Sequence, residues 1–146
     1  MGMLDSELVL ASAQAPTAIG DTPSTNVYDM GSAAGSSAEF TGENLWLNVI
    51  SHTVPTSAGA ATVQAVFQDS PDNAAWTDRL AGPVLGFAAA TPGTALLQAQ
   101  PPVGTQRFWR IVFRIATAVL TAGAFDAYVS NTIQRNTPRP SGFVVS

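Results

Sequence analysis

The stretch QDSPDNAAWTD, residues 68–78, is where side chains able to do chemistry lie closest together in this sequence. Its carboxylates, Asp69, Asp72 and Asp78, and the amide of Asn73 could supply oxygen ligands to a calcium ion. Asp69 and Asp78 could also act as a carboxylate pair in a hydrolytic site. The remaining alternative is that the stretch is a turn between two strands.

The spacing within this stretch favours the turn. A calcium site takes about six to eight oxygen ligands, usually from a loop with glycine at its sharp bend. This stretch has no glycine and lacks the spacing of an EF-hand. Pro71 fixes its own φ angle, and Asp72 and Asn73 are turn formers whose side chains bond nearby backbone groups. We therefore predict a turn without a metal ion, with Trp76 packed back against the domain.

The other reactive side chains do not form a recognisable catalytic set. The chain has no cysteine and no lysine, and its one histidine, His52, has no evident catalytic partner. Strand alternation places His52 on the same face as Trp46, Ile50 and Val54, which is typical of a structural or interface residue rather than a general base. Glycine-rich phosphate loops and histidine clusters are also missing. We expect neither an enzyme nor a bound cofactor.

Charge is scarce and unevenly distributed. Only 11% of residues are charged, against about 25% in typical soluble domains, and 46% are hydrophobic. Residues 1–78 hold nine of the ten acids and no base, whereas residues 79–146 hold all six arginines and Asp126. These opposite charges can be matched within one fold or between subunits. A chain so poor in charge is expected to cover much of its surface with other protein.

The same composition excludes two classes of partner. The net charge is −4 and no cluster of basic residues is dense, so we do not expect nucleic acid to bind. No apolar run approaches the roughly 18 residues that span a bilayer, so we do not expect a membrane segment.

The strongest strand pattern, RFWRIVFRIA at residues 107–116, sets two arginines on one face. Arg110 and Arg114 alternate with Val112, opposite a face of large apolar residues. Such a row is either a solvated outer face or an interface, and arginine and aromatic residues are enriched where subunits meet. We favour the interface, and Glu39, Glu43 and Asp29 are candidate acids to pair with these arginines, from the same or an adjacent subunit. The interface residues that we predict are Arg110, Arg114, Phe108, His52, Glu39 and Glu43.

Short strands separated by glycine and proline turns predict an all-β fold. TVQAVFQ, residues 62–68, places Val63, Ala65 and Phe67 on one face, the period-two pattern of a half-buried strand. Such runs, at spacings of about 8 to 12 residues, predict a sandwich or barrel, and seven or eight strands fit a jelly roll. The other runs are residues 45–54, 79–87, 94–100, 107–116, 122–130 and 142–145.

One structural domain is expected overall. Residues 1–42 are rich in Ala, Ser, Thr, Gly and Pro, and are expected to form an extended N-terminal arm or an irregular edge segment. Within them, residues 6–15 could form a turn or two of helix. Residues 43–146 are expected to form the β-sandwich.

Two motifs resemble a known phage family. AIGDTPSTNVYD at residues 18–29 and SPDNAAWTD at residues 70–78 are similar to the cement, or decoration, proteins of tailed-bacteriophage heads, of the type found in a Bordetella phage. The resemblance covers most of the chain, although residues 32–42 and 80–106 match only in character. It implies a jelly-roll domain on the outer capsid surface of the virion that ties subunits of the major capsid protein together. It also implies a trimer or other small oligomer, and it supplies no catalytic residues.

Two other functions are compatible with the residues. A glycan-binding β-sandwich would present two of Trp46, Trp76 and Trp109 on one exposed face. A structural protein of the phage tail or baseplate is the other alternative, since those assemblies also reuse β-sandwich domains.

Overall fold

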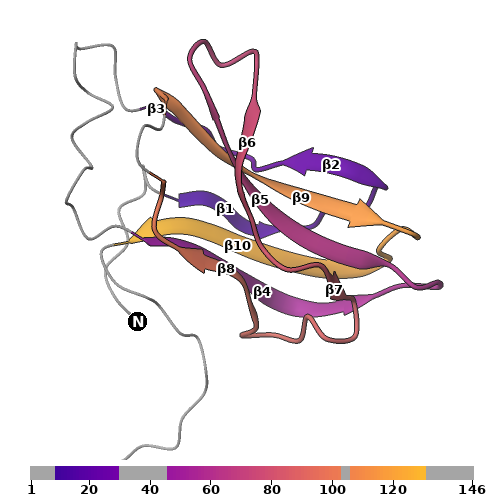
Figure 1. Ribbon diagram of the computed structural model, residues 1–146. Coiled ribbons are helices and arrows are strands. Elements are labelled where there is room, and N and C mark those ends of the chain that lie inside the picture. The colour runs from indigo at the N-terminus through magenta and orange to yellow at the C-terminus, as the bar shows by residue number, and fades with distance from the viewer. Residues whose placement is uncertain (1–8, 30–45, 103–105, 131–146) are drawn as a thin grey trace, which may run out of the picture.

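The computed structural model describes residues 9–29, 46–102 and 106–130, which form a β-sandwich (Figure 1). The smaller sheet has the strand order β1-β10-β4-β8, and the larger has the order β2-β9-β5-β6, with β3 beside β9 and β7 beside β5. Neighbouring strands are antiparallel throughout. The strands are β1 (Val9–Gln14), β2 (Gly20–Pro23), β3 (Tyr28–Asp29), β4 (Trp46–Thr56), β5 (Thr62–Ser70), β6 (Thr77–Ala81), β7 (Leu85–Gly86), β8 (Ala95–Ala99), β9 (Phe108–Ala116) and β10 (Ala122–Ser130).

The strand pairs are nested in the manner of a rolled-up hairpin. β5 pairs with β6 at the centre of the sequence, β4 with β8 outside them, β2 and β3 with β9 outside those, and β1 with β10 outermost. Taking β2 with β3 and β6 with β7 as interrupted strands gives eight strands in two four-membered layers. This is the arrangement of a jelly roll, so the predicted fold class is confirmed.

The core lies between the two sheets and follows the predicted alternation. From the larger sheet come Val63, Ala65 and Phe67 of β5, each with no exposed surface, together with alternate residues of β9. Phe113 of β9 stacks on Phe125 of β10, with their ring centroids 5.5 Å apart, and so joins one sheet to the other. Further core residues are Trp109, Ile111, Ile115, Leu47, Val49, Ala127 and Val129.

The N-terminal segment is part of the sandwich wherever the structure describes it. β1 forms one edge of the smaller sheet, and β2 and β3 lie beside β9 at one edge of the larger sheet. Residues 9–29 are therefore edge strands rather than a free arm; residues 1–8 and 30–42 fall outside the described part. The expectation of a helical turn over residues 6–15 is wrong where it can be compared. Leu10 and Ala11 are buried through the pairing of β1 with β10, and this burial outweighs local helix preference.

The run at residues 79–87 is divided into two strands. β6 ends at Ala81 and β7 begins at Leu85, with Gly82 and Pro83 between them. The Gly82 N–H donates to the Ala65 carbonyl oxygen at 2.8 Å, so the chain passes close to β5 at this break. The predicted strand at residues 142–145 lies outside the described residues. In the part of the chain that the structure covers, no helix is long and apolar enough to cross a membrane.

Candidate interaction surface

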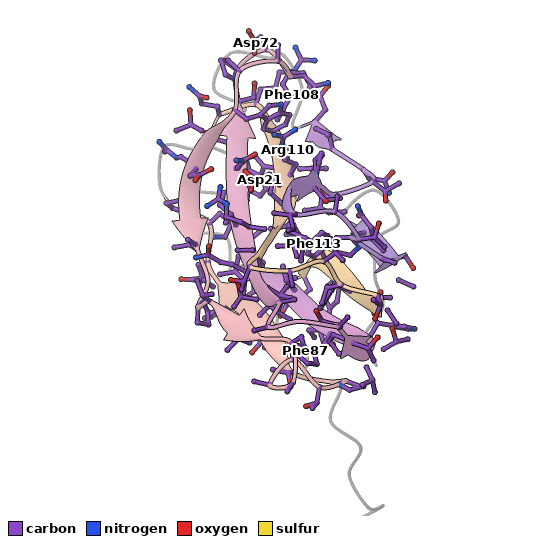
Figure 2. The ribbon with its side chains drawn as sticks, turned by 90° about the vertical axis from the view of Figure 1, so that its right-hand side faces the viewer. Asp21, Asp72, Phe87, Phe108, Arg110 and Phe113 are labelled. Carbon is purple, nitrogen blue, oxygen red and sulfur yellow. The ribbon has the colours of Figure 1, made fainter. Side chains whose placement is uncertain are left out.

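The turn between β5 and β6 is closed by its own side chains and forms the tip of the molecule opposite Phe87 (Figure 2). Asp72 Oδ1 accepts hydrogen bonds from the backbone N–H groups of Ala74 and Ala75, each at 3.0 Å, and from the Ser70 hydroxyl at 3.0 Å. These bonds, that from Ala75 first, hold the pKa of Asp72 below its ordinary value. Asn73 has φ +60°, a conformation that asparagine adopts more readily than most residues. The carboxylate of Asp72 thus stabilises its own turn by accepting hydrogen bonds within it.

The other two aspartates of this stretch are separated from each other. The side chain of Asp69 is 1% exposed; its Oδ2 accepts the Gln106 N–H at 2.8 Å and lies 3.3 Å from Arg79 Nε. Arg79 occupies the irregularity between β5 and β6, where Phe67 pairs with Leu80 but Gln68 pairs with Asp78. Asp78 is 50% exposed and contacts Gln68 and Arg114 instead. Asp69 and Asp78 therefore do not form the hydrolytic pair that was considered.

No metal cluster is found in the described ranges either. Within residues 9–29, 46–102 and 106–130, no three His, Cys, Asp or Glu side chains come together in a way that could hold a metal ion.

A network of polar side chains crosses the outer face of the larger sheet, which Figure 2 turns toward the viewer with Arg110 and Asp21 labelled. At its centre, Arg114 of β9 donates from Nε to Asp21 Oδ1 at 2.7 Å and from its terminal nitrogen to Asp21 Oδ2 at 3.0 Å. The same terminal nitrogen lies 3.3 Å from Asp78 Oδ2. The hydrogen bonds from Arg114 lower the pKa of the Asp21 carboxyl and raise that of the guanidinium. One arginine thereby joins β2 to β6 across the sheet.

The network continues to the hairpin through Gln68 of β5. Gln68 donates from Nε2 to Asp78 Oδ1 at 2.6 Å and accepts the Nε–H of Arg110 at 2.8 Å. The guanidinium carbon of Arg110 lies 4.1 Å from the centre of the Trp76 ring. This is a cation–π contact, and it packs the half-buried Trp76 back against the sandwich. Partial burial lowers the pKa of Arg110, which stays charged because arginine begins so high.

A second pair of arginine and aromatic residue lies beside the first. Arg107 donates to both carboxylate oxygens of Asp29, at 2.6 and 2.8 Å, and this bonding raises the pKa of Arg107. Its guanidinium carbon also lies 4.7 Å from the centre of the Phe108 ring. The two pairs thus lie at the start of β9, which pairs with the end of β5 that leads into the β5–β6 turn. They consist of Arg107 with Phe108 and Arg110 with Trp76. We call these four residues, with Gln68, Asp78, Arg114 and Asp21, the arginine face.

Two valines beneath the arginine face are fully covered although they lie outside the core cluster. Val66 of β5 and Val112 of β9 pair in register, and neither has exposed surface. The neighbouring rows of these strands carry long side chains, including those of Arg110 and Arg114, whose aliphatic parts can cover apolar surface. Arg110 and Arg114, two residues before and two residues after Val112 on the same face of β9, are therefore placed to cover this apolar pair.

His52 belongs to the opposite sheet. It falls in an irregularity of β4, where Ser51 pairs with Phe125 and Thr53 with Ala124, so that His52 has no opposite residue. Its Nδ1 lies 2.8 Å from Asp126 Oδ2, and Asp126 Oδ1 accepts the backbone N–H of Ala13 at 2.7 Å. Asp126 thus ties β10 to irregular points on both neighbouring strands. His52 is not brought together with Arg110 and Arg114.

Four acids of the first half of the chain form ion pairs within the fold with arginines of the second half. The pairs are Asp21 with Arg114, Asp29 with Arg107, Asp69 with Arg79 and Asp78 with Arg114. Asp29 therefore pairs with an arginine, although with Arg107. Glu39 and Glu43 lie outside the described residues. Sequence reasoning missed Asp21 because it lies 93 residues from Arg114, and only sheet register brings the two together.

The three tryptophans lie in three different settings. Trp109 is fully buried, and Trp76 lies on the arginine face. Trp46 is half-buried at the start of β4 in the smaller sheet. The platform of two exposed tryptophans that a glycan-binding module would present is therefore not formed by these residues.

A family model named Bbp16 matches residues 10–129, which is most of the chain and includes nearly every described residue. No curated protein matches the sequence.

Proposed function

Because this chain belongs to Bbp16, a family of Bordetella phage proteins, we propose that it is a structural protein of the virion that binds the outer capsid surface and cements capsid subunits together. Its partner in this role is the major capsid protein. The observation that carries the proposal is the arginine face, where two arginines are held against aromatic rings on the outside of a rigid sheet.

The composition of the arginine face is that of a protein-binding surface. Tryptophan and arginine are the residues that most often dominate the binding energy of interfaces. Here Trp76, Phe108 and Arg110 are half-buried, so part of each side chain remains available for contact. The hydrogen bond from Arg110 to Gln68 and the stacking on Trp76 hold this arginine in one position before a partner arrives. Such preorganisation reduces the entropy lost on binding.

A protein that binds across the joint between two capsid subunits stabilises that joint. A protein that binds only the joined arrangement stabilises it by an amount that grows with the ratio of its concentration to its dissociation constant. Separation of the subunits under the pressure of packed DNA must then also break the contacts of the bound protein. A sandwich tied together by a two-sheet core and by ion pairs across its strands is suited to transmit that load.

The test uses phage heads that lack this protein. Purified chain is added back, bound protein is measured by sedimentation with the heads, and the temperature at which packaged DNA becomes accessible to a dye is recorded. The wild-type chain is expected to bind and to raise this temperature. The variants Trp76→Ala and Arg110→Ala are each expected to lose about 2 kcal/mol or more of binding free energy, roughly thirtyfold in affinity.

Tyr128→Ala provides the matched control. Tyr128 is a half-buried aromatic residue of β10 in the other sheet, and its replacement is expected to leave binding to heads unchanged. Equal thermal survival of heads with and without the wild-type chain would refute cementing. Wild-type affinity in both Trp76→Ala and Arg110→Ala would show that the arginine face is not the surface used.

A further inference from the structure

One arginine of the arginine face differs from the other arginines in what neutralises it. Three of the four arginines that the structure describes form ion pairs with carboxylates of the same chain, at 2.6 to 3.3 Å; they are Arg79, Arg107 and Arg114. The fourth, Arg110, is labelled in Figure 2 and forms no ion pair with a described carboxylate. It contacts the amide of Gln68 and the ring of Trp76 instead.

The pKa values of the arginines show the same distinction. Hydrogen bonds to carboxylates raise the pKa of Arg107 and of Arg114, because they stabilise the charged form. Partial burial lowers the pKa of Arg110, and the charge of Asp21 offsets this only in part. Arg110 has thus lost part of its hydration without gaining a carboxylate partner. A cation in such a setting attracts an anion more strongly than one in bulk water does.

Two contacts hold Arg110 in position and leave its terminal nitrogens available. Gln68, which is 6% exposed, donates from Nε2 to Asp78 at 2.6 Å, so that its Oε1 accepts the Nε–H of Arg110 at 2.8 Å. The ring of Trp76 lies 4.1 Å from the guanidinium carbon. The terminal nitrogens of Arg110 make no hydrogen bond within the part of the chain that the structure describes. A planar guanidinium presents parallel donors there, which match the two oxygens of one carboxylate.

From this geometry we propose that Arg110 is a carboxylate-binding site, which takes the side chain of one Asp or Glu of a partner protein. The proposal rests on the function proposed above for the identity of that partner, the major capsid protein. The chemistry of the site is a property of this chain alone. Within the arginine face it singles out Arg110, because a carboxylate that approached Arg107 or Arg114 would have to compete with one that is already bound.

The surroundings of Arg110 favour a singly charged ligand carried by protein. Asp21 and Asp78 lie on the same face, 46% and 50% exposed, and their charge disfavours an anion with more than one charge, such as phosphate. A sugar acid would be held by stacking of its ring on an open aromatic face. The guanidinium of Arg110 already covers one face of Trp76, which is itself half-buried. A single carboxylate at the end of a protein side chain meets neither obstacle.

The test compares two peptides that differ only in the carboxylate. Acetylated and amidated Gly-Glu-Leu-Gly and Gly-Gln-Leu-Gly are titrated into the purified full chain at low ionic strength. The side-chain N–H signals of Arg110 and Trp76 are followed by nuclear magnetic resonance. The glutamate peptide is expected to shift both signals and to bind about tenfold more tightly than the glutamine peptide, or better, which corresponds to about 1.4 kcal/mol.

Two variants separate the donor geometry of Arg110 from its charge. Arg110→Lys keeps a positive charge and an aliphatic stem, but it lacks the Nε–H that is bonded to Gln68 and the parallel donors of the guanidinium. It is expected to weaken binding of the glutamate peptide about fivefold or more, followed by the Trp76 signal. Arg79→Lys is the matched control, because it makes the same change at an arginine outside the arginine face that lies 3.3 Å from Asp69. It is expected to leave peptide binding unchanged.

Each outcome supports or overturns the proposal. Equal binding of the two peptides, or no shift with either, overturns it, as does an affinity that Arg110→Lys leaves unchanged or that Arg79→Lys lowers equally. Inorganic phosphate or glucuronate that binds more tightly than the glutamate peptide assigns the site to another kind of anion and overturns it too. Circular dichroism shows whether each variant is folded.

The peptide test and the test on phage heads fail separately. The peptides are bound by the isolated chain, so two peptides that bind alike refute the carboxylate site and leave cementing of the capsid standing. Heads that gain no thermal survival from the wild-type chain refute cementing and leave the carboxylate site standing.

Discussion

Replacing Asp69 tests whether this buried carboxylate stabilises the fold. Asp69→Ala removes a carboxylate that is 1% exposed and accepts the Gln106 N–H at 2.8 Å. The Gln106 carbonyl oxygen in turn accepts the indole N–H of Trp109 at 3.0 Å. The substitution therefore removes the hydrogen bond that holds the Gln106 backbone in place to accept the Trp109 indole N–H.

The expected cost can be worked from these contacts. A hydrogen bond to a charged group contributes about 1.5–3 kcal/mol. The contact with Arg79, at 3.3 Å and with that arginine 31% exposed, adds less than about 1 kcal/mol. Asp69→Ala is therefore expected to lower the free energy of unfolding by about 2–4 kcal/mol. Asp69→Asn keeps an oxygen that can accept the Gln106 N–H. Its amide group replaces Asp69 Oδ1, a buried charged oxygen that has no hydrogen-bond partner among the described residues. Asp69→Asn is therefore expected to lower the free energy of unfolding by less than about 1.5 kcal/mol.

The assay is urea unfolding followed by tryptophan fluorescence, because Trp109 lies in the affected region. Asp78→Ala is the control: Asp78 is also a carboxylate bound to an arginine, but it is 50% exposed, and its loss is expected to cost less than about 1 kcal/mol. The reasoning is refuted if Asp69→Ala costs no more than Asp78→Ala, or if Asp69→Asn is as damaging as Asp69→Ala.

Two further predictions concern surface charge and backbone packing. Arg114 lowers the pKa of Asp21 below its ordinary 3.8, so this pair stabilises the native state above pH 3.8 and loses its effect as the pH falls through the lowered pKa. Asp21→Asn is expected to cost less than about 1 kcal/mol at neutral pH, because Asp21 is half-exposed, and the difference from wild type in urea midpoint should vanish in strong acid. A Cβ at Gly82 would overlap the Leu96 carbonyl oxygen, whereas one at Gly86 would meet nothing within 4 Å. Gly82→Ala is thus expected to lower the free energy of unfolding by about 1–3 kcal/mol and so to lower the melting temperature, whereas Gly86→Ala is expected to leave both unchanged. Equal melting temperatures for the two variants would contradict the packing argument.

Strand patterns in the sequence predicted the core correctly because burial in a sandwich follows the period-two alternation of side chains. Residues 62–68 and 107–116 each have one uninterrupted apolar face, and these faces lie side by side on the core-facing side of the larger sheet. The prediction failed at residues 6–15, whose composition favours a helix locally. There the outcome depended on β10, which lies more than a hundred residues further along the chain.

The candidate surface was predicted in part. Alternation alone placed Arg110 and Arg114 outside the core, and turn chemistry alone assigned Asp72 to the hairpin. The partner of Arg114 could not be found in this way, because Asp21 has no local signal that distinguishes it from the other acids.

The sequence by itself determined that this protein is all-β, which residues line its core, and that its charges are few and divided between its halves. Those properties depend on local periodicity and composition, which can be read over a few neighbouring residues. The tertiary structure alone decided which acid pairs with which arginine and that Asp69 and Asp78 are kept apart. Each of these is set by the register of strands far apart in sequence, and register is fixed by the packing of the whole sandwich.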